Sequence, residues 1–434
     1  MPAPSMALPA VRFERFEGVD VDGADLALVP GAAGDAARLE AVCGQLRECA
    51  AFNLNGWLKL RAAPRVPSQT DLYVRIETRA PPVLPAPDTP ANLVPALRVY
   101  VYPEPEELAR VAAPADYKYG AEPRFMRLLQ ASGLVVADPA GANLFVVPVR
   151  CTAHRYSVAD RVAGQVAAEH AARRLVDHVR HQWPFFNRSA GADHAYLCAH
   201  DMGASCLRQT DALFRKNAIG LLNTGDLADA DFVPHKDVTL PPNVGDGCPT
   251  CTQGGGPAPT GSTPPALFRR HLAFFAGQFD RGRVRPRVKE LFWAHDGFVL
   301  IDGFLAPADY QALLQTSVFC LFLRGHRAWS PRLLDALWHG CIPVIVSDGY
   351  DLPLAELIDW NAVALLVPEA QLPTLPGRLR AVPQGRRQAM QLAGWRARAW
   401  LTWPAQPYDP MPNAFVAVLT LLARRVHALS LPPP

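Results

Sequence analysis

The sequence predicts an α/β protein with two doubly wound domains and a small α+β module ahead of them. Three observations lead to this prediction. The chain has 434 residues, more than a single hydrophobic core usually supports. Two runs of alternating strand and helix patterns are separated by a segment rich in Gly and Pro, residues 245–265. Alternation of this kind is typical of parallel sheets covered by helices on both faces.

Composition places the boundaries between these parts. Residues 1–80 form the small module, and residues 81–95 form a proline-rich linker. The first doubly wound domain then covers residues 96–265, and the second covers residues 266–434. We therefore expect two sheets in the larger part of the chain, joined by the Gly/Pro-rich segment.

The most informative stretch of the second domain runs from Val318 to Pro353. An apolar run from Val318 to Leu323 predicts a buried strand. Ser330 followed by Pro331 is typical of a helix start with Ser330 as N-cap, and the apolar spacing extends that helix to His339. Cys341 to Ser347 predicts a second strand. The stretch is therefore one βαβ unit with parallel strands. A last strand is expected from Trp360 to Val367.

Polar residues of this unit are candidates for ligand binding. Arg324 ends the first strand, Ser330 and Arg332 begin the helix, and Asp335 lies within it. Open parallel sheets bind ligands beyond the carboxyl ends of their strands. An arginine facing a helix N-terminus suits an anionic group such as a diphosphate. An ordinary ion-pair network among Arg324, Arg332 and Asp335 would explain the same residues.

A polar pair also follows a predicted strand of the first domain. His200 and Asp201 come directly after the strand from Ala195 to Ala199, so they belong to its carboxyl end. Asp193-His194 lies at the other end and is expected to be structural. The chain contains neither the G-x-x-x-x-G-K-[ST] nor the G-x-G-x-x-G pattern, which argues against nucleoside triphosphate and NAD chemistry. A nucleotide-sugar transferase, a two-domain binding protein and a nucleotide-dependent ligase all remain compatible with two such domains.

Charge and hydropathy exclude some classes of partner. The 43 basic and 40 acidic residues give a net charge of +3, which favours neither nucleic acid nor an anionic membrane. No apolar stretch reaches the roughly 20 residues that a membrane-spanning helix needs. Met1 to Ala10 lacks the basic and apolar regions of a secretory signal.

The nine cysteines predict disulfides rather than a metal site. Cys248 and Cys251 form a CxxC pair, but no second CxxC or His pair follows, so a loop disulfide is favoured. Cys320 and Cys341 fall within predicted buried strands and are expected to be small core residues. We predict no bound metal.

Several sequence blocks together resemble the exostosin family, glycosyltransferase family 47. They occur in family order over residues 96 to 385. The blocks are RVYVYPEP at 98–105, DPAGANLFVVPV at 138–149, PFFNRSAGADHAYLCAHDMG at 184–203, LAFFAG at 272–277, SPRLLDALWHGCIPVIVSDGYDLP at 330–353 and VPE at 367–369. The resemblance implies a GT-B fold and inverting transfer from a nucleotide sugar, usually UDP-linked, without an obligatory metal or other cofactor. It also implies a Golgi lumenal setting, usually as a membrane protein.

The resemblance assigns roles to the candidate residues. Arg285 and Arg324 would contact the diphosphate, while Ser330 and Arg332 would line the nucleotide. Asp335 stands where the family usually has Glu, the acid expected to hold the ribose hydroxyls; one methylene fewer shortens its reach. The candidates for the base that deprotonates the acceptor are Asp201 and His200.

The N-terminal module resembles a PAN/apple domain over about forty residues. Helix-forming residues lead to a Cys43-x5-Cys49-x2-Phe52 pattern followed by NGWLK at 55–59. The resemblance implies a disulfide between helix and sheet and an oxidising compartment. An unrelated α+β module would explain the same pattern.

The expected partners are a nucleotide sugar and a glycan or polysaccharide acceptor, with no nucleic acid. Homo- and hetero-oligomers both remain open. The alternative function is a catalytically inactive glycan-binding or scaffolding protein, suggested by the shortened acid Asp335 and by the module. The identities of the donor sugar, the acceptor and the linkage are not encoded in these patterns.

Overall fold

The computed structural model of the protein separates into two compact units, Met1–Val83 and Leu84–Pro434. The structure describes residues 12–20, 25–29, 31–45, 49–59, 66–76, 97–111, 119–243, 269–409 and 412–430. Three expectations lie outside the described residues: the linker at 81–95, the pair Cys248 and Cys251, and the segment Met1 to Ala10.

The N-terminal unit is an antiparallel sheet with one helix. Its strands are β1 (Arg12–Phe16), β2 (Val19–Asp20), β3 (Asp25–Leu28), β4 (Ala51–Asn53), β5 (Trp57–Lys59), β6 (Val66–Pro67) and β7 (Leu72–Ile76), and its helix is α1 (Ala36–Gln45). The five-stranded sheet has the order β1-β7-β4-β5-β3, and β2 pairs with β6. Leu39 of the helix, Phe52 and Leu58 form its core. A disulfide joins Cys43 to Cys49 and links α1 to the chain entering β4. The PAN/apple assignment itself stays a prediction.

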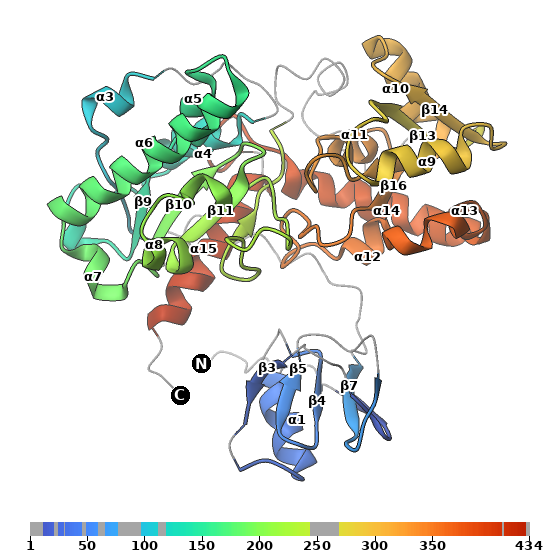
Figure 1. The fold of residues 1–434 in the computed structure, drawn as a ribbon, viewed down its shortest axis with the longest axis horizontal. Helices are drawn as coiled ribbons and strands as arrows, with labels where there is room; N and C mark the ends of the chain where they lie inside the picture. Colours follow the sequence, from blue (N-terminus) through green and yellow to red (C-terminus); the bar gives the residue numbers. More distant parts are fainter. Residues whose placement is uncertain are drawn as a thin grey trace, which may run out of the picture. The chain divides into compact units, whose positions relative to one another are not determined.

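The first parallel sheet of the larger unit has the order β12-β11-β10-β9-β8 (Figure 1). Its strands are β8 (Val99–Val101), β9 (Leu144–Val147), β10 (His194–Cys198), β11 (Ile219–Leu222) and β12 (Val238–Thr239). The helical elements between them are α3 (Glu106–Ala109), α4 (Ala121–Ala131), η1 (Pro139–Gly141), α5 (Cys151–Tyr156), α6 (Arg161–Gln182), α7 (Phe185–Ser189), η2 (Gly203–Leu207) and α8 (Ala212–Asn217). Successive residues of β10 alternate between two cores: Ala195 and Leu197 face one, Tyr196 and Cys198 the other. The sheet is therefore buried on both faces.

The second parallel sheet has the order β14-β13-β15-β16-β17. Its strands are β13 (His271–Gly277), β14 (Phe298–Asp302), β15 (Ser317–Leu323), β16 (Ile342–Val346) and β17 (Leu365–Leu366). Its helical elements are α9 (Val284–Phe292), α10 (Pro307–Thr316), α11 (Arg332–Trp338), α12 (Trp360–Val363), η3 (Glu369–Thr374), α13 (Leu375–Ala381) and α14 (Gln384–Leu401). The chain order reverses between β13 and β15, and polar loops follow both strands. Such a switch point is where doubly wound sheets bind ligands.

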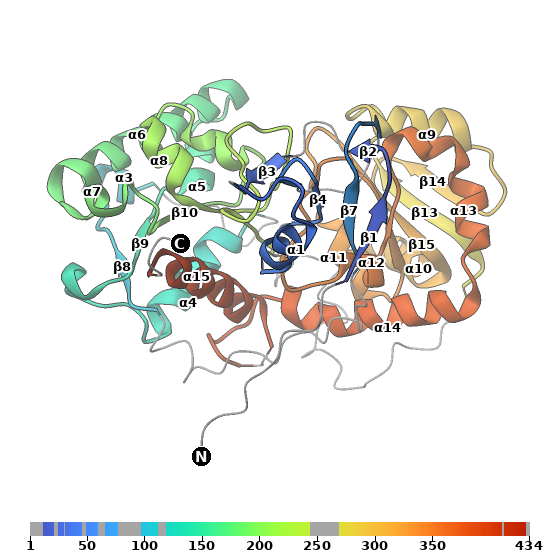
Figure 2. The same ribbon diagram turned by 90° about the horizontal axis from the view of Figure 1, so that it is seen from below.

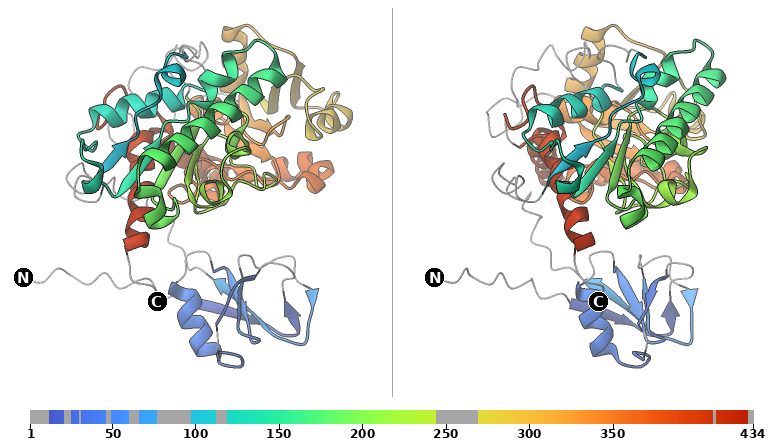
Figure 3. Two further views of the ribbon diagram at one scale, coloured as in Figure 1. Left: turned by 60° about the vertical axis from the view of Figure 1, so that its left-hand side comes forward. Right: turned by 90° about the vertical axis from the view of Figure 1, so that its left-hand side faces the viewer.

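The last helix, α15 (Ala414–Ser430), packs on the first sheet rather than the second (Figures 2 and 3). The Phe415 ring lies 5.6 Å from that of Phe125 on α4. The Arg425 guanidinium donates to the carbonyls of Lys236 (2.7 Å) and Asp237 (3.0 Å) beside β12. The chain therefore returns to the first domain, whereas the sequence places everything from 266 to 434 in the second. The apolar faces of α4 and α15 are buried in the same core, which α15 extends.

The βαβ unit has the strands and helix that the sequence predicts. The N-cap of α11 is Pro331, not Ser330. Cys320 and Cys341 are buried in the core as expected, and they also form a disulfide between the middle of β15 and the residue before β16. After the unit, Trp360–Val363 is a short helix and only Leu365–Leu366 pair as a strand, so the strand predicted for residues 360–367 is wrong over its first half. Among the described residues, no helix is long and apolar enough to span a bilayer.

Candidate active site

Two arginines meet at the carboxyl edge of the second sheet. Arg332, the first residue of α11, donates from Nε to the Ala276 carbonyl at the end of β13 (3.0 Å). Arg285 lies in the first turn of α9. It donates to the Leu323 carbonyl at the end of β15 (3.3 Å) and to the Gln278 carbonyl (3.3 Å). Backbone carbonyls at the ends of two neighbouring strands therefore orient both guanidinium groups.

Both guanidinium groups make cation–π contacts with the ring of Phe275 on β13. Its ring centroid is 5.4 Å from the Arg285 guanidinium carbon and 5.3 Å from that of Arg332. Within the described part of the chain, neither arginine has a carboxylate ion-pair partner. Burial, and after it the charge of Arg332, lowers the pKa of Arg285 to about 10, which still leaves it charged at neutral pH. Two like charges held together in this way favour binding of an anion between them.

Glycines at the strand ends make room for the two guanidinium groups. A Cβ atom on Gly277 would lie 2.6 Å from Nη2 of Arg332, and one on Gly325 would lie 2.8 Å from Nη2 of Arg285. Any larger residue at either position would displace the cation next to it. Gly277 and Gly325, at the ends of β13 and β15, therefore leave the space that the two guanidinium groups occupy.

Arg324 has a different role in the structure. Its Nη2 forms an ion pair with Asp226, which follows β11 of the first domain, and its Nη1 donates to the Asp348 carbonyl (2.9 Å). Both side chains of the ion pair are buried. Next to it, the Leu227 amide donates to the Gly349 carbonyl (2.8 Å). The guanidinium of Arg324 thus already has a carboxylate partner and connects the two sheets, and contact of Arg324 with a diphosphate stays a prediction.

Ser330 lies just before α11, and Asp335 lies in its middle. The Ser330 hydroxyl accepts from the Arg332 amide (3.4 Å) and from Nη1 of Arg332 (3.0 Å). The buried Asp335 carboxylate accepts from the Tyr310 hydroxyl (3.1 Å) on α10. Because α11 has only seven residues, its dipole is short, and the positive charge at this edge comes mainly from the arginines.

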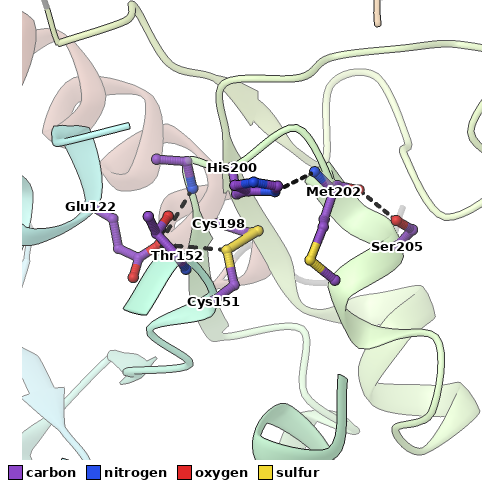
Figure 4. Close-up of a disulfide and its surroundings, with 8 residues drawn as sticks. Glu122, Cys151, Thr152, Cys198, His200, Met202 and Ser205 are labelled. Atoms are coloured by element: carbon purple, nitrogen blue, oxygen red, sulfur yellow. Dashed lines mark hydrogen bonds between the residues drawn. A yellow bond between two sulfur atoms is a disulfide. The ribbon is translucent and has the colours of Figure 1, made fainter. Parts of the chain in front are cut away.

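His200 and Asp201 lie together at the carboxyl edge of the first sheet. Nδ1 of His200 accepts from the Met202 amide (3.2 Å), and its ring centroid is 4.7 Å from that of Tyr119 (Figure 4 shows the histidine and Met202). Oδ1 of Asp201 accepts from the indole N–H of Trp329 (2.8 Å). Trp329 directly precedes Ser330, so this bond joins the polar edge of the first sheet to the start of α11. Of the site residues that the sequence predicts, Arg285, Arg332 and Ser330 lie together, and Trp329 links Asp201 to the residue before Ser330.

Glu122 is a buried acid at the first sheet that the sequence did not single out (Figure 4). Its Oε2 accepts from the Thr152 hydroxyl (3.2 Å) and, at longer range, from the Ala199 amide (3.4 Å). Burial raises the pKa of this carboxyl to about 7. Nearby, the Cys151–Cys198 disulfide joins α5 to the end of β10. Glu122 and the disulfide thus fix the chain immediately before His200. The sequence signal that could have identified Glu122 is its position on the apolar face of α4, beside Phe125 and Leu129.

Two further polar side chains lie at the same edge. Asn223 and Thr224 follow β11, whose Leu222 pairs with Cys198 of β10. The amide atoms of Asn223 and the hydroxyl of Thr224 are buried, with no hydrogen-bond partner among the described residues. Buried polar groups are normally satisfied, and exceptions are common at functional sites. By contrast, Asp193-His194 at the other end of β10 lies in a buried network, with Nε2 of His194 3.0 Å from the Tyr102 hydroxyl.

Comparison with known proteins gives a consistent family match. Residues 93–382 match the Exostosin GT47 domain. A probable glucuronosyltransferase of Oryza sativa subsp. japonica is 29% identical over 362 residues, covering 77% of this chain and 82% of that protein. A probable beta-1,4-xylosyltransferase of Arabidopsis thaliana is 29% identical over 357 residues, covering 76% and 82%. The crystal structure of Anabaena HepE with UDP and glucose has a TM-score of 0.33 and 12% identity, covering 77% of this chain and 99% of that one. So low a structural similarity carries no argument about ligands.

Proposed function

Because the chain belongs to the exostosin family and is a glycosyltransferase of family 47, we propose that it transfers a sugar from a UDP-sugar to a glycan acceptor with inversion at the anomeric carbon. The observation that carries the proposal is the pair Arg285 and Arg332 at the switch point of the second sheet, two cations that have no carboxylate partner among the described residues. A nucleoside diphosphate is an anion of matching size and charge.

The arginine pair would bind the diphosphate and stabilise it as a leaving group. Guanidinium groups bind phosphate oxygens through two parallel hydrogen bonds, and each of these is charge-assisted. Negative charge grows on the β-phosphate oxygen as the bond to the sugar breaks, so cations held at that position lower the barrier. In this proposal the two arginines supply the positive charge, and no metal is required.

Asp201 is our proposed base, with His200 as a supporting donor. The Met202 amide donates to Nδ1 of His200, which places the proton of a neutral imidazole on Nε2 and makes that nitrogen a donor. The Asp201 carboxylate keeps accepting capacity beyond the bond from Trp329. The acceptor hydroxyl would lose its proton to Asp201 as its oxygen attacks the anomeric carbon. UDP would leave from the opposite face, which inverts the configuration.

The relatives suggest which substrates to test first. They are named as probable glucuronosyl- and beta-1,4-xylosyltransferases, so UDP-glucuronate and UDP-xylose are the first donors, and a xylose oligosaccharide is the first acceptor. We also propose a Golgi lumenal location, because three disulfides suit an oxidising compartment. The relatives are named as probable transferases, and they give no support to an inactive scaffold.

Calorimetry with UDP tests the donor site. We expect measurable binding to the wild-type protein, and a loss of roughly 10-fold or more in Arg332→Ala, because a hydrogen bond to a charged group contributes about 1.5–3 kcal/mol. Arg287→Ala is the matched control: Arg287 lies on α9, is half exposed and pairs with Glu290. Wild-type protein that binds no UDP at millimolar concentration would disprove the proposal, as would equal losses in Arg332→Ala and Arg287→Ala.

Mass spectrometry of products tests the reaction. Wild-type protein incubated with UDP-xylose or UDP-glucuronate and xylohexaose should release UDP and add one sugar to the oligosaccharide. NMR of the new anomeric proton reports its configuration, and retention of the donor's configuration would contradict the inverting mechanism.

A further inference from the structure

Tyr156 is an aromatic ring at the point where the buried helix α5 ends and an exposed stretch, residues 156–163, begins. It ends α5, whose preceding residues, Cys151 to Arg155, are all buried, yet 44% of Tyr156 remains exposed. A partly exposed tyrosine beside polar groups can serve as a binding surface, because its ring is apolar and its hydroxyl is polar. Whether Tyr156 can contact a substrate depends on its distance from the candidate active site.

A series of aromatic rings connects Tyr156 with the start of α11. The Tyr156 ring centroid lies 5.7 Å from that of His200, in an edge-on arrangement. The Tyr119 centroid lies 4.7 Å from His200 and 5.6 Å from Trp329. Trp329 in turn donates to Asp201. The series therefore runs from an exposed ring, past both candidates for the base, to the residue that precedes Ser330.

The backbone holds Tyr156 rigidly. The Cys151–Cys198 disulfide fixes the start of α5 to β10. At its end, α6 approaches so closely that a Cβ on Gly164 would lie 2.3 Å from the Arg155 carbonyl oxygen. The Arg155 guanidinium lies 5.3 Å from the Tyr156 ring. A ring fixed from three directions loses little conformational entropy when a ligand binds to it.

The chemistry of an exposed tyrosine suits a sugar ring. A β-linked pyranose has an apolar face of C–H groups and polar hydroxyls at its edge. An aromatic ring can cover the apolar face, while the phenol hydroxyl and nearby polar groups contact the hydroxyls. A free phosphate or another small anion would gain nothing from such a surface.

We infer that Tyr156 forms an acceptor subsite, on which a pyranose unit of a β-linked glycan stacks so that a neighbouring hydroxyl reaches Asp201 and His200. This inference rests on the proposed transferase function and adds the residue that positions the acceptor. Tyr156 touches the substrate but takes no part in the donor site.

Binding of hexasaccharides tests the subsite without requiring turnover. Saturation-transfer NMR would be recorded with xylohexaose and with cellohexaose, in the presence of UDP, for the wild-type protein and for Tyr156→Ala, Tyr156→Phe and Leu213→Ala. Leu213 is the control, because it is an apolar residue of the same domain with similar exposure, 49%, on α8. We expect the dissociation constant of the bound hexasaccharide to rise ~10-fold in Tyr156→Ala, as loss of one aromatic contact implies. It should rise only a few-fold in Tyr156→Phe, which keeps the ring and loses the hydroxyl, and it should stay near the wild-type value in Leu213→Ala.

The outcomes separate this inference from the proposed function. Equal hexasaccharide affinity in the wild-type protein and Tyr156→Ala would overturn the subsite, as would a wild-type protein that binds neither hexasaccharide. UDP calorimetry on the same samples reports the donor site independently. Tyr156→Ala should bind UDP as the wild-type protein does, so loss of UDP binding in that variant would also count against a role confined to the acceptor.

Discussion

The carboxyl edges of the two parallel sheets are built from opposite kinds of residue. The second sheet presents Arg285 and Arg332, which have no acidic partners among the described residues. The first presents Asp201 and His200 with the buried acid Glu122 behind them. The edge of the second sheet suits a negatively charged substrate. The edge of the first sheet suits a substrate that must lose a proton. In the proposed reaction, the two similar folds would take separate roles through the chemistry of their loops.

The largest expected effect comes from removing both arginines. Arg285→Ala combined with Arg332→Ala should weaken UDP binding by roughly 3–6 kcal/mol, because two charge-assisted contacts are lost. Asp201→Asn should leave UDP affinity unchanged and abolish transfer, since it alters only the opposite edge. Calorimetry and a transfer assay on both proteins measure this. A large loss of UDP affinity in Asp201→Asn would show that the two edges do not act separately.

The next effect concerns the buried ion pair that joins the two edges. Asp226→Ala should destabilise the protein by about 3–5 kcal/mol, because it leaves Arg324 buried without its carboxylate. Chemical denaturation measures the change. The double variant with Arg324→Ala should lose less than the sum of the two single variants.

Arg324→Ala also decides between the two roles of this residue. If Arg324 only joins the sheets, this variant should bind UDP with an affinity within a few-fold of wild type under conditions where it remains folded. A loss as large as that of Arg332→Ala would restore the diphosphate role that the family resemblance implies.

A smaller effect is the pH dependence of the first edge. Burial raises the pKa of Glu122 from 4.5 to about 7, so the folded protein binds this proton more tightly than the unfolded chain. The stability that this carboxyl contributes is complete below about pH 4.5 and is lost as the pH rises through 7. The loss amounts to roughly 3 kcal/mol, taking 1.36 kcal/mol per pKa unit.

Glu122→Gln should remove that dependence. Denaturation of the variant at pH 5 and pH 8 should give more similar free energies of unfolding than for the wild-type protein, with Glu107→Gln, an exposed acid, as the control. An unchanged difference between the two pH values would show that Glu122 does not titrate in this range.

The smallest effect involves the sulfur atoms. Those of Cys151, Cys198 and the free Cys206 lie within 4.8 Å of one another at the first edge, and no other such group occurs among the described residues. Burial raises the pKa of the Cys206 thiol, so exchange should be slow in the folded protein. Heating at alkaline pH should produce disulfides between Cys206 and Cys151 or Cys198, which peptide mapping would detect. Cys206→Ser should prevent them. The Cys320–Cys341 bond should remain paired throughout.

Local patterns in the sequence determined most of the secondary structure and the identity of the cations. Apolar runs and the Ser-Pro start predicted the βαβ unit and placed Arg332 at the beginning of its helix, because strand and helix periodicity depends on near neighbours. The family blocks added the role of Arg285, while strand–helix alternation had already indicated two domains. These features need no knowledge of distant contacts.

Only the tertiary structure decided which remote partners meet. Asp226 lies 98 residues from Arg324 and yet pairs with it, and Trp329 reaches Asp201 over 128 residues. The last helix, α15, leaves the second domain to cover α4, and Cys320 bonds to Cys341. Each outcome depends on where two separately encoded elements lie once the sheets have packed. The sequence of either partner alone carries no information about that distance.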